Sequence, residues 1–258
     1  MIIDFVHSFQ SEWLKKKKSA ASWLTVIGGF FIPAIMLIAR FTDITKTVAE
    51  NSSASLWETL YNRCWQFMGL FLLPMGVILA TSLITQLEFR NNTWKQIHAT
   101  PQTFTTLFFA KLSVIVVMMV QFFLLFNLGI LVIGMLPALI IKRIPFPVQS
   151  IPLLLFLKGN LKFFIDCLPI IALQYLISLQ FKNFMVPIGV GLSLLVASMI
   201  GISWKYGYLI PYSYCTYNFL GKKIFANQSI NIHFWAIGYF LLFSVASYFL
   251  YINRREKG

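Results

Sequence analysis

Residues 64–87 read CWQFMGLFLLPMGVILATSLITQL, a run of 24 amino acids without a charged side chain. The hydrocarbon core of a bilayer is about 30 Å thick, and a helix needs about 20 apolar residues to cross it. This run is therefore long enough to span a membrane. Pro74 lies inside it, which membrane helices tolerate when neighbouring groups satisfy the freed backbone carbonyl.

Runs of similar length recur along the rest of the chain. They predict six membrane-spanning helices, at about 19–39, 64–87, 106–136, 160–180, 184–203 and 233–253. The composition agrees, because 58% of the residues are hydrophobic and only 11% are charged, whereas soluble domains carry about 25% charged residues. We therefore expect an all-α integral membrane protein in which residues 1–258 form a single transmembrane domain.

The placement of positive charge predicts the orientation. Lys15–Lys18 directly precede the first span, while Arg40 and Lys46 follow it. Lysine and arginine next to a span favour the cytoplasmic side, and the first helix usually dominates. Six spans put both termini on one side, so we expect both in the cytoplasm. The net charge of +13 is assigned to this topology and to membrane lipid, and no nucleic-acid partner is expected.

Residues 1–18 are predicted to form an interfacial helix. Ile2, Val6, Phe9 and Trp13 recur at helical spacing, and polar residues fall mainly on the other face. An amphipathic segment followed by lysines at headgroup level is typical of a helix that lies along the membrane surface. It would lead into the first span as an elbow.

The outer connector between the fifth and sixth spans, 202–232, is rich in aromatic residues. Amphipathic aromatic rings gather at membrane interfaces. Two interpretations stay open: a segment that re-enters the outer leaflet, where protein would have to satisfy its backbone, or an exposed loop held at the surface by its tyrosines.

The cytoplasmic connector after the second span, 88–103, carries helix signals. An asparagine or threonine at 91–93 can cap a helix N-terminus, and Pro101 ends the segment, which leaves about two turns. Trp94 and Ile97 share one face. Because so short a helix is unstable alone in water, it needs either the membrane surface or a soluble partner. Both interpretations stay open at this point.

The fifth span carries small residues at every fourth position, and they form one face of the helix: Gly189, Ser193, Ala197 and Gly201. Small faces let helices approach closely within a membrane. Packing within one subunit and packing between two subunits both remain possible uses of this face.

Asp166 is the only acidic residue inside a predicted span, and Lys162 lies one turn before it. At i,i+4 spacing the two side chains can form an ion pair. Charged residues at membrane depth are candidates for a proton or cation path. A structural ion pair at the outer end of the fourth span is the favoured interpretation.

Motifs for catalysis, metal binding or nucleotide binding are missing from the sequence. The three cysteines, Cys64, Cys167 and Cys215, are far apart and are expected to serve packing. The phosphate-binding pattern G-x-x-x-x-G-K-[ST] does not occur. We therefore expect no enzyme activity and no bound cofactor or metal, and an active pump would need a separate motor protein.

The run Glu88–Lys111 resembles the connector between the second and third spans of type-2 ABC exporter permeases. The shared features are a glutamate, then Asn92-Thr93-Trp94-Lys95, then a proline, then Ala110-Lys111 at the start of the next span. The layout of interfacial helix, six spans and elaborated outer loop is similar along nearly the whole chain. The likeness is greatest to lantibiotic-protection and related antibiotic-resistance permeases.

The resemblance implies a homodimer, or a pair with a related permease, joined to two cytoplasmic ABC ATPases that bind ATP and Mg²⁺. It implies an ATPase-coupling role for these residues of the connector: Glu88, Asn92, Thr93, Trp94, Lys95 and Ile97. Ile97 is included because it lies on the same helix face as Trp94. It also places the fifth span near the subunit interface. The implied activity is export of an amphipathic substrate from a bacterial plasma membrane, with a lantibiotic favoured over a lipid or a lipid-linked sugar.

A second hypothesis is a secondary transporter or channel that uses Lys162 and Asp166 and needs no ATPase. The chain shows no internal repeat and few ionisable residues within its spans. Secondary transporters commonly have both an internal repeat and such residues, so the ATP-driven exporter is the leading hypothesis.

Overall fold

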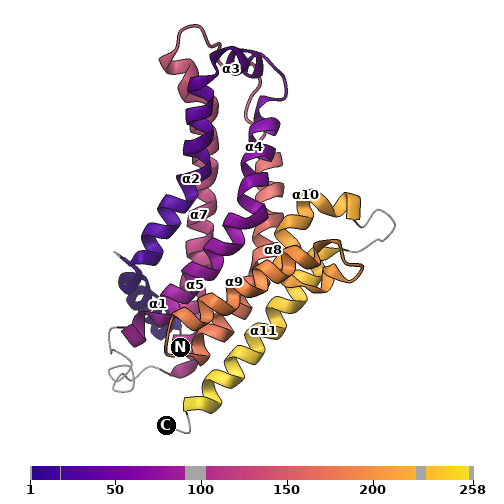
Figure 1. The fold of residues 1–258 in the computed structure, drawn as a ribbon. Coiled ribbons are helices and arrows are strands. Elements are labelled where there is room, and N and C mark those ends of the chain that lie inside the picture. Colours follow the sequence, from indigo (N-terminus) through magenta and orange to yellow (C-terminus); the bar gives the residue numbers. More distant parts are fainter. Residues whose placement is uncertain (1, 18, 91–102, 225–230, 256–258) are drawn as a thin grey trace.

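The computed structural model describes residues 2–17, 19–90, 103–224 and 231–255 (Figure 1). Within these ranges the chain is helical and contains no strand. Six helices are long and apolar enough to cross a membrane, which confirms the expected all-α membrane fold. They cover Ala20–Thr42, Leu56–Leu87, Phe104–Ile140, Leu153–Gln180, Met185–Ser203 and Ile232–Asn253.

In chain order, the described elements are α1 (Ile2–Lys16), α2 (Ala20–Thr42), α3 (Ile44–Asn51), α4 (Leu56–Phe67), η1 (Met68–Leu72), α5 (Leu73–Arg90), α7 (Phe104–Ile140), α8 (Leu153–Gln180), α9 (Met185–Ile200), η2 (Gly201–Ser203), η3 (Gly207–Leu209), η4 (Pro211–Ser213), α10 (Tyr214–Ile224) and α11 (Ile232–Arg255). Figure 1 shows that α1 and the last turns of α11 lie at one end of the molecule, called the terminal end below. Helix α3 crosses the opposite end, called the far end.

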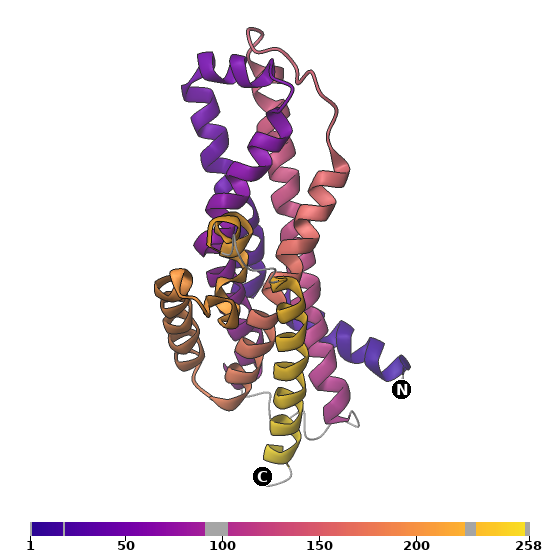
Figure 2. The same ribbon diagram turned by 90° about the vertical axis from the view of Figure 1, so that its right-hand side faces the viewer.

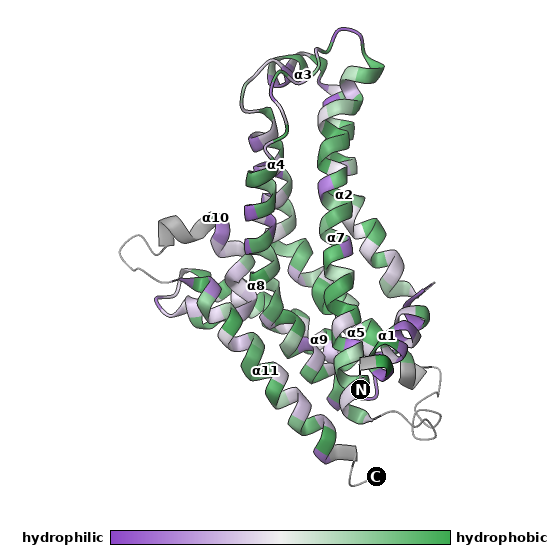
Figure 3. Ribbon diagram, turned by 180° about the vertical axis from the view of Figure 1, so that it is seen from behind, coloured by the Kyte–Doolittle hydropathy of each residue, from purple (hydrophilic) through white to green (hydrophobic). Residues whose placement is uncertain are grey.

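Helix α7 is longer than a bilayer requires. Its 37 residues span about 55 Å at 1.5 Å per residue, whereas the hydrocarbon core is about 30 Å thick. Helix α4, near the far end, contains hydrophilic positions (Figure 3). Two of its polar residues, Glu58 and Asn62, are exposed. The far end therefore extends beyond the hydrocarbon layer, and the helix that contains the apolar run 64–87 begins earlier, at Leu56.

A buried arginine holds the far end together. Arg40, at the end of α2, is only 4% exposed and donates to Asn51 and, at 3.5 Å, to Glu50. Glu50 also pairs with Arg63 of α4 at 2.8 Å, and the Asn51 amide donates to the backbone carbonyl of Pro145 at 2.8 Å. These bonds join α2, α3, α4 and the connector that precedes α8.

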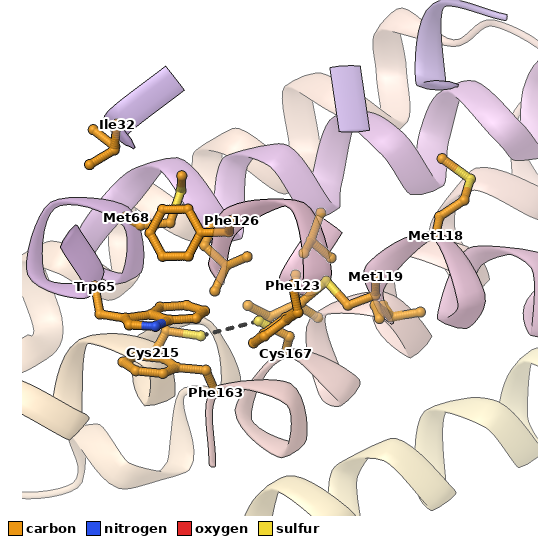
Figure 4. Packing of buried hydrophobic residues seen from close by; sticks show 14 of the residues in the cluster. Ile32, Trp65, Met68, Met118, Met119, Phe123, Phe126, Phe163, Cys167 and Cys215 are labelled. Carbon is orange, nitrogen blue, oxygen red and sulfur yellow. Dashed lines mark hydrogen bonds between the residues drawn. The ribbon is translucent and has the colours of Figure 1, made fainter. Parts of the chain in front are cut away.

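The core forms where α4, α7 and α8 meet around Trp65 (Figure 4). The indole is fully buried and stacks on Phe163 of α8, with ring centroids 4.1 Å apart. It also contacts Phe123 and Phe126 of α7, at 5.1 and 4.8 Å between centroids. Aromatic packing of this kind fixes the relative positions of the three helices.

The second span changes its helix type at η1, a π-helical stretch that ends two residues before Pro74. A proline has no N–H group, so it frees the carbonyl four residues earlier, which is that of Leu70. Thr216 of α10 donates its hydroxyl to this carbonyl at 3.4 Å. A helix of the outer connector thus satisfies the backbone of the second span.

Helix α1 contacts α7 through a polar side. Ser8, Glu12 and Lys16 follow one another at single-turn spacing and are all buried. Glu12 lies 3.8 Å from the Lys111 ammonium, and Lys16 donates to the Gln121 side chain at 2.7 Å. Apolar residues remain exposed on the helix, namely Ile3, Val6 and Leu14. The helix occurs where the sequence predicts it, and its position along the membrane surface stays a prediction.

The outer connector packs onto the bundle through its tyrosines. Tyr212, Tyr214 and Tyr217 are buried. Tyr212 donates to Gln174 of α8 at 3.3 Å, and the other two donate to backbone carbonyls within the connector. Burial raises the pKa of all three phenols, so they remain neutral hydrogen-bond donors. These tyrosines therefore turn into the protein, and re-entry of the segment into the outer leaflet stays a prediction.

Candidate functional site

The small face of α9 is turned away from the rest of the chain. Gly189, Ser193 and Ala197 are exposed, and a Cβ at Gly189 would meet no atom within 4 Å. The buried side of α9 includes Gly191 and Leu195 instead. Gly201 closes the predicted face and is half-buried. In Figure 2, α9 stands at the left edge of the molecule. Its small face is thus open to lipid or to a second protein.

Gln174 connects four elements and was not singled out from the sequence. It is fully buried and donates to the Ser82 hydroxyl and to the Pro187 carbonyl, both at 2.8 Å. It accepts from Tyr212 at 3.3 Å. A Cβ at Gly191 would lie 2.5 Å from its side-chain oxygen, so glycine allows α9 to approach here. A glutamine inside an apolar run is the signal that could have found it.

An apolar cavity of about 240 Å³ lies between α2, α5 and α7. Ile27 and Phe31 line it from α2 and are exposed, while Met75 and Gly76 line it from α5 and are half-buried. A Cβ at Gly76 would meet no atom within 4 Å. All these residues belong to membrane-spanning helices. The cavity can therefore take an apolar group that enters from the bilayer.

Thr81 is one of the residues that line this cavity, and its hydroxyl oxygen is buried behind the cavity wall. This oxygen has no hydrogen-bond partner among the described residues. A buried hydroxyl without a partner costs free energy, so an incoming polar group could satisfy it. The site thus combines apolar walls with two threonines, Thr25, whose hydroxyl donates to the Ala21 carbonyl, and Thr81. This arrangement suits an amphipathic molecule.

The connector with the proposed coupling role lies only in part within the described residues. Glu88 belongs to the C-terminal turn of α5, and its side chain is outside the described part of the chain. Asn92, Thr93, Trp94, Lys95 and Ile97 are outside it as well. Helix α5 ends and α7 begins at the terminal end (Figure 1), so the connector is attached there. Its coupling role stays a prediction.

Asp166 has other partners than the expected Lys162. It is fully buried, Asn218 of α10 donates to Oδ2 at 2.6 Å, and Nδ1 of His233 in α11 lies 2.8 Å from Oδ1. Lys162 is exposed, and no described salt bridge joins it to Asp166. The Asp166 carboxylate points towards α10 and α11. Residue spacing within α8 predicts only partners on the same helix, so these contacts could not be predicted from it.

Groups of three or more His, Cys, Asp or Glu side chains suited to a metal ion do not occur in the described part of the chain. The Asp166 cluster contains one carboxylate, one imidazole and one amide. Its chemistry is hydrogen bonding between α8, α10 and α11.

Comparison with known families gives a match over most of the chain. Residues 8–198, which are 191 of the 258 residues, match the family model described as ABC-2 family transporter protein. The match includes the cavity, the connector 88–103 and the small face as far as Ala197. No curated protein and no solved structure matches the chain.

Proposed function

This chain belongs to the ABC-2 transporter family, and we propose that it is the membrane-spanning subunit of an ATP-driven exporter. It is a multi-pass membrane protein. The sequence carries no phosphate-binding motif, so the energy would come from separate ABC ATPase subunits that bind ATP and Mg²⁺.

The apolar cavity between α2, α5 and α7 is the observation that carries the proposal. It lies within the spans and is bordered by exposed residues of α2. An amphipathic substrate could place its apolar part there and its polar part near Thr81. The resemblance to lantibiotic-protection permeases favours a peptide antibiotic, exported for self-protection, over a lipid or a lipid-linked sugar.

The open small face of α9 supports a second permease copy, or a related permease, as partner. Gly189, Ser193 and Ala197 are exposed in the single chain, and small faces are typical of close helix pairs in membranes. A second subunit packed here would cover them. The assembly would then contain two permeases and two ATPases.

The coupling step would use the connector 88–103. ATP binding would draw the two ATPases together, and each would hold a segment around Trp94. The motion would tilt α5 and α9 and change the side on which the cavity opens. A ligand shifts such an equilibrium only through different affinity for the two states, so the ATPase must bind one state more tightly.

The proposed topology puts the terminal end in the cytoplasm of a bacterial cell. Helix α1 lies at this end (Figure 1), and its last turn carries Lys15 and Lys16, with Lys17 directly after it. Positive charge next to a first span favours the cytoplasm. The far end and α10 then lie on the outer side.

Photo-cross-linking from position 94 tests the proposal. Trp94 is replaced by a photoreactive aromatic amino acid in the full chain, within its native membrane. We expect a cross-linked polypeptide that carries the phosphate-binding motif G-x-x-x-x-G-K-[ST]. The same replacement at exposed Trp204, beyond α9, is the matched control and should give no such product. Cross-links from position 94 to lipid alone would contradict the proposal.

A further inference from the structure

Two cysteines that are 48 positions apart meet inside the core. The Sγ atoms of Cys167 on α8 and Cys215 on α10 lie 3.3 Å apart (Figure 4). Both side chains are fully buried. The S–S bond of a disulfide is about 2.05 Å long, so an approach of roughly 1 Å separates this contact from a bond. The sequence predicts only a packing role for these cysteines, because their spacing does not show that α10 folds back onto α8.

Neighbouring residues hold the same two helices in place. Asp166, directly before Cys167, accepts a hydrogen bond from Asn218 of α10 at 2.6 Å. Thr216, directly after Cys215, donates to the Leu70 carbonyl at 3.4 Å. The two thiols thus face each other between anchored stretches of helix. The two thiols meet because helix α10 packs against the bundle, and neither thiol lies in a loop.

We propose that Cys167 and Cys215 form a disulfide that fastens α10 to α8. The inference rests on the proposed topology, which places α10 on the outer side of the membrane, because disulfides persist outside the cytoplasm. A bond across 48 positions would restrict the unfolded chain and so stabilise the packed outer segment. All three cysteines are buried free thiols in the structure, and Cys64 of α4 takes no part in the proposed bond.

The oxidant is a thiol–disulfide oxidoreductase acting before α10 packs. The Cys215 thiolate attacks the disulfide of this protein, whose S–S bond breaks as a mixed disulfide forms. The Cys167 thiolate then attacks Sγ of Cys215, and the oxidoreductase leaves as a dithiol. The oxidoreductase takes up two electrons from the two cysteines. Its two thiols also gain two protons, which equals the number that the cysteines lose.

The order of these events follows from burial. Hydrogen bonding with Cys167 and burial raise the pKa of the Cys215 thiol well above its ordinary value. The thiolate is the reactive form, so the packed thiol reacts poorly. The mixed disulfide on Cys215 therefore forms before α10 packs, and the attack by Cys167 completes the bond as α10 packs against α8. The bond is then shielded from soluble reductants.

Counting thiols on the full chain tests the proposal. Native membranes are dissolved in denaturant that already contains a maleimide, with and without prior reduction, and the mass of the chain is measured. Of the three cysteines, we expect only Cys64 to react before reduction and all three to react afterwards. C64S should then show no reactive thiol, and C167S should show two, Cys64 and Cys215. Three reactive thiols in the unreduced wild-type chain would overturn the disulfide.

A separate reporter distinguishes this failure from a wrong topology. Ser203 is exposed at the end of η2, and S203C is placed in a chain whose three native cysteines are replaced by serine. Labelling of intact cells by a membrane-impermeant maleimide would support the outer location. Labelling only after permeabilisation would overturn the topology on which the proposed function also rests.

Discussion

At the scale of single residues, buried polar side chains decide how the helices meet. Gln174 joins α5, α8, α9 and η4, and Arg40 joins α2 to α3. Burying such a group is costly unless its hydrogen bonds are satisfied. Each of these residues therefore favours one arrangement of its neighbours over alternatives that leave it unpaired.

Asp166 provides the clearest test at this scale. Asp166→Ala removes the acceptor of Asn218 and the partner of His233. We expect the free energy of unfolding to fall by about 2 kcal/mol, since hydrogen bonds to charged groups contribute about 1.5–3 kcal/mol. Denaturant unfolding of the purified protein in detergent measures the loss.

Lys162→Ala is the matched control, because Lys162 is exposed one turn away on the same helix. It should change stability by less than about 0.5 kcal/mol. An equal loss in both variants would restore the ion pair that the sequence predicts.

At the scale of elements, the long helices could be predicted and the short ones could not. An uncharged run such as 64–87 shows that a helix must cross the bilayer, whatever its neighbours are. Helix α3 depends on Arg40, and α10 depends on its buried tyrosines, Tyr214 and Tyr217. Short helices gain most of their stability from such tertiary contacts. Periodicity predicts α1, yet its polar residues Ser8 and Glu12 face the protein.

Close packing between α4 and α7 yields a second prediction. A Cβ at Gly134 would lie 2.5 Å from the Trp57 ring, which is fully buried and rigid. We expect Gly134→Ala to lower the free energy of unfolding by about 1–3 kcal/mol, the usual cost of overpacking a core. Thermal unfolding in detergent measures the loss as a lower Tm.

The matched control is Gly76→Ala in α5, where a Cβ meets no atom within 4 Å. Alanine favours a helix over glycine by up to about 1 kcal/mol, so this variant should be as stable as the wild-type chain or slightly more stable. Similar losses in both variants would show that backbone effects and not the Trp57 contact decide the outcome.

At the scale of the whole molecule, the parts of the candidate site were predictable to different degrees. Four-residue spacing marks the small face of α9, and the structure leaves most of that face exposed. The cavity could not be predicted, because α2, α5 and α7 form it together. The partners of Asp166 follow it by 52 and 67 positions, so only the folded chain brings them together.

The open face of α9 yields a prediction about assembly. Gly189→Leu adds a large side chain to the proposed subunit interface, and we expect it to shift the complex from two permease copies to one. Gly238→Leu, on α11, is the matched control because its Cβ also meets no atom within 4 Å. Native mass spectrometry counts the copies. Two copies in both variants would place the interface elsewhere.

ATP hydrolysis by the purified complex tests the central claim, that energy enters this protein through the connector 88–103. We expect Glu88→Ala and Trp94→Ala to abolish the hydrolysis that depends on the permease while the chain is still inserted at normal levels. Truncating one aromatic anchor costs about 2 kcal/mol or more at an interface, which is roughly thirtyfold in affinity. Trp204→Ala, the control, should hydrolyse ATP at the wild-type rate. Wild-type rates in the Glu88 and Trp94 variants would contradict the account.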